Sequence, residues 1–290
     1  MARTRTIIFI LSALAFILTA CAPSRPAAPT AVPATPTPAA SEQKLTFKSG
    51  NLTLEGFLYK PAGDGPFPAL VWNHGREAHP DEGSEFDSIA AAFVPEGYVV
   101  FAPVRRGQGG SDGESIEDEI KEERERNGDA AAQVLFAKLM ATEQLDDQLA
   151  GLAYLESQPF VDRDRIGVMG CADGGVQAIL GAAADHSYKA AVAISPASDN
   201  WAANLPLQTQ LLQAVGSIDV PVYIFHASQD ANKDPGRTLA KEFERLRKTY
   251  RLKIYTPFGT PEQQTTCFGG PIGVEIWKPE ALTFFGQVLR

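Results

Sequence analysis

Histidine is scarce in this chain and is confined to its first four fifths. There are four, His74, His79, His186 and His226. None lies beyond Asp230, so the C-terminal segment cannot supply a histidine general base. Paired histidines at a metal-ligand spacing such as H-E-x-x-H are also missing, and no phosphate-loop or dinucleotide fingerprint occurs. We therefore expect neither a metal site nor a cofactor.

The longest apolar run is too short for a confident membrane span. Residues 7–20 follow Arg3 and Arg5 and end in L-T-A before Cys21. A basic start, a short apolar stretch and small residues before the cut are typical of a secretory signal. The L-T-A-C ending resembles a bacterial lipobox, which implies that Cys21 becomes the lipidated first residue of the mature protein. An ordinary signal peptide or an uncleaved anchor is the alternative, and each places the mature chain outside the cytoplasm.

The residues after this leader have little besides Pro, Ala, Thr and Ser. Residues 22–43 cannot bury apolar surface, so we interpret them as a tether between the lipid anchor and a domain spanning residues 44–290. The net charge is −9, and −11 once the two leader arginines are removed. This charge disfavours nucleic acid and anionic membrane faces as partners, so the expected contact with a bilayer is through the lipid.

The domain alternates short apolar strands with helices. Residues 44–60 alternate as a β-hairpin that turns at residues 49–51. Further strands are predicted at residues 67–73, 98–103, 166–170, 190–195, 220–226 and 252–255. Helices between such strands predict an α/β fold, with a mostly parallel central sheet covered on both faces.

An acidic insertion at residues 114–142 interrupts this alternation. Residues 114–126 hold seven acidic and three basic side chains, which favours a solvated helix. The alternative is a mobile cap, because the segment follows the carboxyl end of a strand, where α/β sites lie. Residues 142–157 then predict an amphipathic helix whose leucine stripe belongs to the core.

The most informative stretch is residues 165–175, which read R-I-G-V-M-G-C-A-D-G-G. A short apolar strand, a glycine-rich corner and a helix are the setting of a nucleophile elbow, G-x-S-x-G. Aligned on Gly170 and Gly174, the motif places Ala172 at the tip. The scaffold of a serine hydrolase is therefore present without its nucleophile.

Several motifs in order carry a family resemblance. They are W-N-H-G-R at 72–76, A-P-V-R-R-G-Q-G-G-S at 102–111, D-D-Q-L-A-G-L-A-Y-L at 146–155, V-D-R-D-R-I-G-V-M-G-C at 161–171, H-A-S-Q-D at 226–230 and the closing I-W-K-P-E-A-L-T-F-F. Together they resemble a dienelactone hydrolase-like α/β hydrolase, related to prolyl oligopeptidase catalytic domains. The resemblance implies hydrolysis of esters, lactones or peptide-like bonds through an acyl-enzyme, with nucleophile, acid and histidine in that chain order.

Two of the three implied catalytic roles are missing from the chain. Ala172 stands at the nucleophile position, and its methyl group has no lone pair with which to attack. Thr266 stands at the histidine position, and its hydroxyl has no useful pKa near neutrality. Asp230 matches the acid, with an ordinary turn aspartate as the alternative. The resemblance also implies an oxyanion hole formed by the backbone amides of Arg76 and Asp173.

Cys171 and His79 leave other interpretations open. Cys171 could replace the nucleophile with His79 as a substitute base, it could be an inert buried thiol, or it could form a disulfide with Cys267. His74 is expected to shape the oxyanion loop and His226 to be a core or turn residue. The favoured interpretation is a lipid-anchored hydrolase-fold protein without catalysis that binds a small carbonyl or ester compound. The alternative is an esterase that uses Cys171 and His79.

Overall fold

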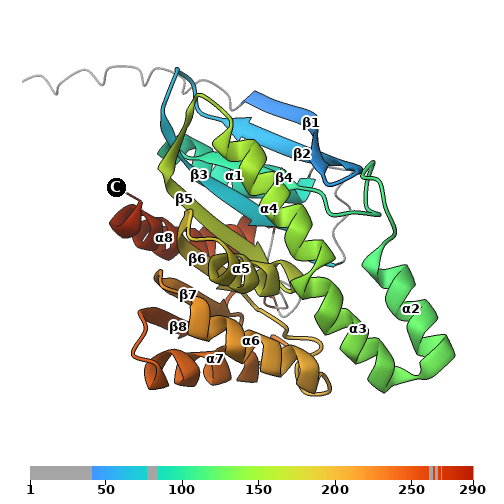
Figure 1. Ribbon diagram of the computed structural model, residues 1–290. Coiled ribbons are helices and arrows are strands. Elements are labelled where there is room, and N and C mark those ends of the chain that lie inside the picture. Colours follow the sequence, from blue (N-terminus) through green and yellow to red (C-terminus); the bar gives the residue numbers. More distant parts are fainter. Residues whose placement is uncertain (1–40, 77–83, 261–263, 265–266, 269, 290) are drawn as a thin grey trace, which may run out of the picture. The chain divides into compact units, whose positions relative to one another are not determined.

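The computed structural model describes residues 41–76, 84–260, 264, 267–268 and 270–289 (Figure 1). All of these belong to one compact unit. The predicted signal peptide, Cys21 and most of the tether precede the described residues. His79 and Thr266 also lie outside them.

Eight strands form one sheet in the order β1-β2-β4-β3-β5-β6-β7-β8. They are β1 Ser41–Ser49, β2 Leu52–Lys60, β3 Phe67–Asn73, β4 Val99–Pro103, β5 Val161–Cys171, β6 Tyr188–Ile194, β7 Val222–His226 and β8 Tyr250–Ile254. β1 and β2 pair antiparallel, β2 pairs antiparallel with β4, and every other pairing is parallel. The predicted mostly parallel sheet with an N-terminal hairpin is confirmed. β1 begins at Ser41, three residues before the predicted start, and the hairpin turns through Gly50 at φ 56°.

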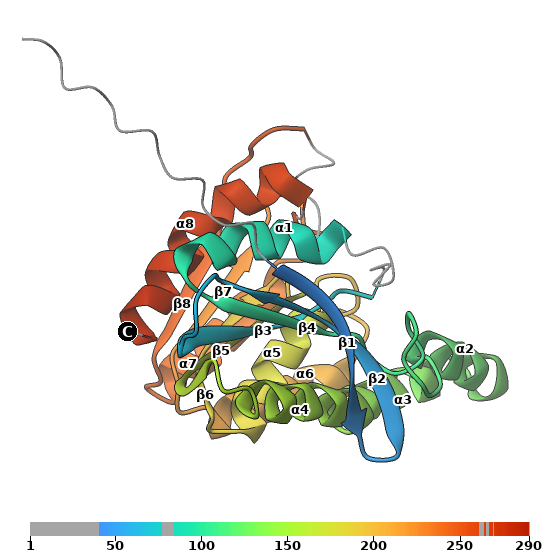
Figure 2. The same cartoon turned by 90° about the horizontal axis from the view of Figure 1, so that it is seen from above.

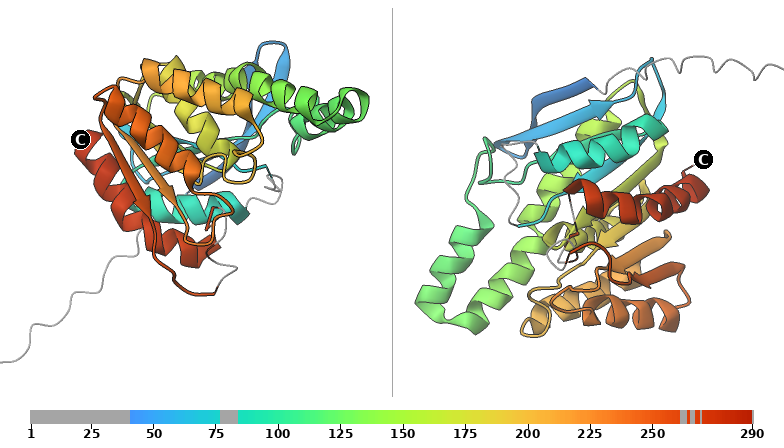
Figure 3. Two further views of the ribbon diagram at one scale, coloured as in Figure 1. Left: turned by 90° about the horizontal axis from the view of Figure 1, so that it is seen from below. Right: turned by 180° about the vertical axis from the view of Figure 1, so that it is seen from behind.

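Helices cover both faces of the sheet. They are α1 Ser84–Phe93 with the 3₁₀ turn η1 Val94–Glu96, α2 Ile116–Asn127, α3 Asp129–Ala141, α4 Glu143–Glu156, α5 Asp173–Ala184, α6 Leu205–Ser217, α7 Asp234–Arg245 and α8 Gly270–Val288. α1 and α8 lie on one face, and α4, α5, α6 and α7 lie on the other (Figures 2 and 3). Each layer has its own apolar core against the sheet. Among the described helices, none is long and apolar enough to cross a membrane.

The acidic insertion folds as two successive helices, α2 and α3. Ser115 caps α2 by accepting a hydrogen bond from the Asp118 N–H at 3.1 Å, and of the twelve residues of α2 only Ile116 is buried. α3 instead places Phe136, Leu139 and Met140 in the core. The solvated helix that the charge pattern favoured is therefore α2, whereas α3 is part of the packed layer.

α4 carries a buried polar cluster beside its predicted leucine stripe. Leu152 and Leu155 are buried as expected, and so is Asp147, at 1% exposure. Asp147 accepts hydrogen bonds from Ser49 Oγ at 2.7 Å and from the Arg106 guanidinium at 2.7 and 2.9 Å. A buried carboxylate needs such partners, because an unpaired one would cost several kcal/mol, about 3–5. This cluster ties the hairpin turn and the loop after β4 to α4.

Candidate active site

The corner between β5 and α5 has the backbone of a nucleophile elbow. Ala172 lies between the two elements at φ 53° and ψ −112°, a strained conformation for a residue with a Cβ. Its N–H donates to the Ile194 carbonyl at 2.9 Å, and its carbonyl accepts from the Val176 N–H at 3.1 Å. The side chain is partly exposed. The predicted position of Ala172 at the tip thus agrees with the geometry of this turn.

The two flanking glycines are required by close backbone crossings. A Cβ on Gly174 would lie 1.9 Å from the Asn73 carbonyl oxygen, and one on Gly170 would lie 2.4 Å from the Gly174 carbonyl oxygen. Both distances are far below van der Waals contact. The strand, the turn and the loop after β3 pass one another so closely that only glycine fits.

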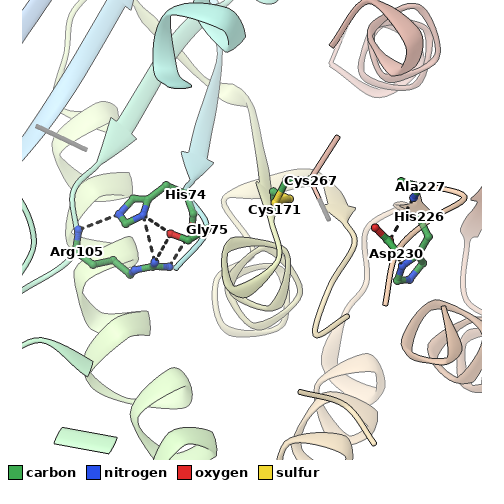
Figure 4. The surroundings of a disulfide bond; sticks show 8 residues. All are labelled: His74, Gly75, Arg105, Cys171, His226, Ala227, Asp230 and Cys267. Atoms are coloured by element: carbon green, nitrogen blue, oxygen red, sulfur yellow. Dashed lines mark hydrogen bonds and ion pairs between the residues drawn. A yellow bond between two sulfur atoms is a disulfide. The ribbon is translucent and has the colours of Figure 1, made fainter. Parts of the chain in front are cut away.

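The loop after β3 is held to the loop after β4 by a buried histidine and a buried arginine. The His74 Nδ1–H donates to the Gly75 carbonyl at 2.8 Å, while His74 Nε2 accepts from the Arg105 N–H at 3.4 Å (Figure 4). Arg105 also donates to the carbonyls of His74 and Gly75, both at 3.0 Å. Burial and the Arg105 charge hold the pKa of His74 well below its usual value, so the ring is neutral. His74 shapes this loop, as the sequence predicted.

The two predicted oxyanion residues are brought together. Arg76 Nε donates to Asp173 Oδ2 at 2.7 Å, and the Arg76 guanidinium lies over the Phe136 ring at 4.9 Å. Burial would lower the pKa of Arg76, but the Asp173 carboxylate outweighs this and raises it. Asp173 is the first residue of α5, so its N–H has no partner within the helix. The Asp173 carboxylate, which could have competed with a bound anion, is paired with Arg76 instead.

Asp230 is buried at the end of β7 and is paired with His226. Its Oδ2 accepts from His226 Nδ1 at 2.7 Å and from the Ala227 N–H at 3.2 Å. His226 Nε2 accepts in turn from the Gly236 N–H at 3.2 Å, so both ring nitrogens are used. Asp230 Oδ1 has no hydrogen-bond partner in the described part of the chain. His226 is thus a core residue, as expected. Its pairing with Asp230 was not foreseen, although their spacing of four residues was visible in H-A-S-Q-D.

The residues on either side of Thr266 are tied to the acid loop and the elbow. The Gln264 carbonyl accepts from the Gln229 N–H at 3.2 Å, and its Oε1 accepts from Ser228 Oγ. Phe268 is 1% exposed. Its packing partners are Phe225, Tyr255 and Phe258. Gln264, two residues before the predicted histidine position, is therefore bonded to the loop that carries Asp230.

Cys171 and Cys267 form a disulfide, with Cα atoms 5.4 Å apart and a sequence separation of 96 (Figure 4). The interpretations of Cys171 as a nucleophile and as a free buried thiol are therefore wrong for this structure, because its sulfur is bonded to Cys267. The disulfide alternative is confirmed. Although Cys171 points inward and is only 1% exposed, the loop before α8 reaches it.

The described histidines offer no base to the elbow. His74 and His226 are both fully buried, and their ring nitrogens are hydrogen-bonded. His186 is exposed in the loop between α5 and β6. It precedes the amino end of β6, whereas the elbow follows the carboxyl end of β5, so the two lie at opposite ends of the parallel strands. Among residues 41–76, 84–260 and the described part of the C-terminal segment, no imidazole faces Ala172.

Comparisons with known proteins agree with this architecture. The pattern of the Dienelactone hydrolase family matches residues 54–259. Quorum-quenching protein AidA of Acinetobacter baumannii (strain MDR-ZJ06) is 25% identical over 161 residues, 56% of this chain and 46% of that protein. This chain therefore spans less than half the length of that relative.

Solved structures show the same fold at lower identity. The acylaminoacyl peptidase of Pyrococcus horikoshii superposes with a TM-score of 0.63 at 20% identity, covering 86% of this chain and 42% of that one. The esterase Pf2001 of Pyrococcus furiosus gives a TM-score of 0.63 at 16% identity, covering 87% and 94%. With the sheet order, the elbow and a family match over well more than half of its length, this chain belongs to the dienelactone hydrolase family of α/β hydrolases.

Proposed function

We propose that this protein is a membrane-anchored, extracytoplasmic lipoprotein whose hydrolase fold binds a small carbonyl or ester compound without hydrolysing it. The observation that carries the proposal is Ala172 at the strained tip of the elbow, at φ 53°. An acyl-enzyme needs an oxygen or sulfur at that point, and a methyl group cannot form the bond.

Loss of the base supports the same conclusion independently. Proton transfer to and from the reacting groups contributes about 10²–10⁴-fold to such reactions. Here Asp230 is engaged by His226, whose ring is bonded on both sides and faces the core. Restoring a nucleophile alone would therefore leave it without a proton acceptor.

Backbone N–H groups, which are present whatever the side chain, support the proposed binding. The Asp173 N–H at the start of α5 and the Arg76 N–H in the adjacent loop are backbone donors, and the positive end of α5 reinforces the first. Gly75 and Ala172 lie close together, since a Cβ on Gly75 would be 3.9 Å from the Ala172 Cβ. Two such donors beside a small, partly exposed side chain suit a carbonyl oxygen.

Hydrolysis of p-nitrophenyl acetate tests the proposal. The wild-type protein should show no turnover above buffer and no labelling by a fluorophosphonate probe. The double variant Ala172→Ser/Thr266→His should gain esterase activity and labelling, and Ala172→Ser alone should not. Wild-type turnover above buffer would overturn the proposal, and its persistence in Cys171→Ala would show that Cys171 is not the nucleophile.

The carbonyl-binding part has its own test. The amide analogue of this ester, p-nitroacetanilide, should raise the melting temperature of the wild-type protein. Ala172→Phe should abolish this shift, because the larger side chain fills the space beside the two donors, whereas Ala172→Gly should keep it. An unchanged melting temperature across amide, ester and ketone analogues would instead indicate a purely structural domain.

The anchor is tested at Cys21. Mass spectrometry of the mature protein should find a diacylglyceryl group on that cysteine, and Cys21→Ala should release the domain from membranes. An intact leader in the mature protein would contradict the lipoprotein assignment.

A further inference from the structure

The disulfide occupies the place where a hydrolase of this fold brings its nucleophile and base together. It joins the residue before the elbow tip, Cys171, to the residue after the histidine position, Cys267. A Cβ on Gly75 would lie 3.8 Å from Cys267 Sγ and 3.9 Å from the Ala172 Cβ. Gly75, which has no side chain, thus lies beside both Cys267 Sγ and the methyl group of Ala172.

The two cysteines differ in burial. Cys171 is 1% exposed and packs in the core on the α1–α8 face of the sheet, whereas Cys267 is partly exposed. Cys267 also has φ 74°, a left-handed conformation that is unfavourable for a residue with a Cβ. Its backbone is therefore held in place by its surroundings, and the disulfide is one of the restraints that hold it.

We propose that Cys171–Cys267 is an exchangeable disulfide, a thiol–disulfide exchange site whose co-substrate is a dithiol that attacks Cys267. The inference rests on the disulfide and its surroundings, and it does not depend on carbonyl binding at the same edge of the sheet. It assigns this centre a two-electron redox chemistry in place of acyl transfer.

The exchange proceeds in two balanced steps. One thiolate of the dithiol attacks Cys267 Sγ, forming a mixed disulfide, and the bond to Cys171 breaks so that Cys171 leaves as a thiolate and takes up a proton from water. The second thiol of the reductant, as its thiolate, then attacks the reductant sulfur that is bonded to Cys267, and Cys267 is released as a thiolate that takes up a proton. The dithiol ends as a cyclic disulfide, and the protein gains two electrons and two protons as two thiols.

Reduction of the native protein tests the proposal directly. The mature full chain is incubated with dithiothreitol, thiols are blocked with iodoacetamide, and peptide mass mapping separates these cysteines from Cys21. We expect both to be labelled while the circular dichroism spectrum stays native, at a rate within about tenfold of that in urea. A disulfide that is reduced only when the chain unfolds would overturn the proposal and leave a purely structural bond.

Two single variants test the direction of attack. In Cys171→Ala the remaining Cys267 thiol should react with a disulfide reagent about tenfold or more faster than the Cys171 thiol of Cys267→Ala, because it is the accessible one. Equal or reversed rates would contradict attack at Cys267. The wild-type reduction needs neither variant, so it decides the proposal even where a variant fails to fold.

Discussion

The elbow and the acid–base region lie at the same edge of the sheet, but they retain different parts of a hydrolase. The elbow, residues 170–174, has the backbone of such a turn, with two obligatory glycines and a strained tip, and Ala172 stands where the sequence predicts the nucleophile. The acid–base region is Asp230 with its partner His226, and Gln264, Cys267 and Phe268 around the base position. It contains Asp230, which the sequence predicts to be the acid, and its loop is fixed by a disulfide and buried contacts.

The difference teaches what each region contributes to folding. The elbow is a crossing point of three chain segments, so its glycines and its tip conformation are needed whether or not chemistry takes place there. The described residues of the loop between β8 and α8 are held by the disulfide, the hydrogen bonds of Gln264 and the packing of Phe268, and such bonds can replace a catalytic contact. Substitutions that disturb the backbone and substitutions that remove side-chain bonds should therefore change the free energy of unfolding differently in the two regions.

Gly174→Ala should have the largest effect. The new Cβ would lie 1.9 Å from the Asn73 carbonyl oxygen, so β3 and α5 must move apart. We expect a loss of at least about 3 kcal/mol of unfolding free energy, measured by urea denaturation. Gly216→Ala on α6 is the matched control, because nothing lies within 4 Å of its Cβ. It should stabilise the helix by about 0.5–1 kcal/mol, and equal losses in both variants would remove the steric explanation.

Removing the disulfide should have the next largest effect. Cys171→Ala/Cys267→Ala removes the cross-link between two residues with a sequence separation of 96. We expect this to lower the unfolding free energy by about 2–4 kcal/mol. Wild-type protein unfolded in excess reductant should lose a similar amount. A loss below about 1 kcal/mol would show that Gln264 and Phe268 hold the loop without help from the sulfurs.

Two variants of Asp230 test whether its hydrogen bonds or its charge stabilise the folded protein. Both of its hydrogen bonds go to Oδ2, so Asp230→Asn can keep them with its amide oxygen, whereas Asp230→Ala loses both. We expect the alanine variant to lose about 2–3 kcal/mol of unfolding free energy and the asparagine variant less than about 1. Similar losses in both would mean that the negative charge itself is needed beside His226.

Acid should weaken the loop that His74 shapes. Its pKa in the folded protein lies below that of the unfolded chain, so the unfolded chain binds the extra proton and stability falls as the pH drops through about 6.5. We expect His74 to contribute up to about 1.4 kcal/mol of this loss per pH unit below that point. Urea denaturation at pH 7.5, 6.5 and 5.5 should show a flatter dependence in His74→Asn. An unchanged slope would assign the acid sensitivity to other groups.

The sequence predicted most of the sheet and the elbow because both depend on local patterns. Alternation and short apolar runs marked the hairpin and the parallel strands, and G-x-x-x-G with Ala172 between marked the tip. Counting histidines excluded a base beyond Asp230 without any structure. What stayed open depends on distant contacts. The Cys171–Cys267 bond was one of three alternatives, since a residue before the tip points inward and nothing local shows that the loop before α8 reaches it.

Buried polar side chains were the other feature that the sequence could not place. Asp147 lay in a motif whose leucines predicted a core stripe, and nothing in its neighbourhood indicated that Ser49 and Arg106 would surround it. His226 and Asp230 were placed separately, the first as a core residue and the second as an acid, although they bond to each other. In both cases the partner is chosen by tertiary packing.

The smallest effect should come from restoring a hydroxyl at the tip. Ala172→Ser adds one partly exposed atom at a conformation that alanine already tolerates, so we expect a change below about 0.5 kcal/mol in urea denaturation. It should also gain no esterase activity, because serine is a weak nucleophile without an adjacent base. Ala172→Val is the contrasting variant: a β-branched side chain at φ 53° should cost clearly more, about 1–2 kcal/mol. If serine and valine are tolerated equally, the tip is not strained, and the retention of an elbow backbone without its chemistry would need another explanation.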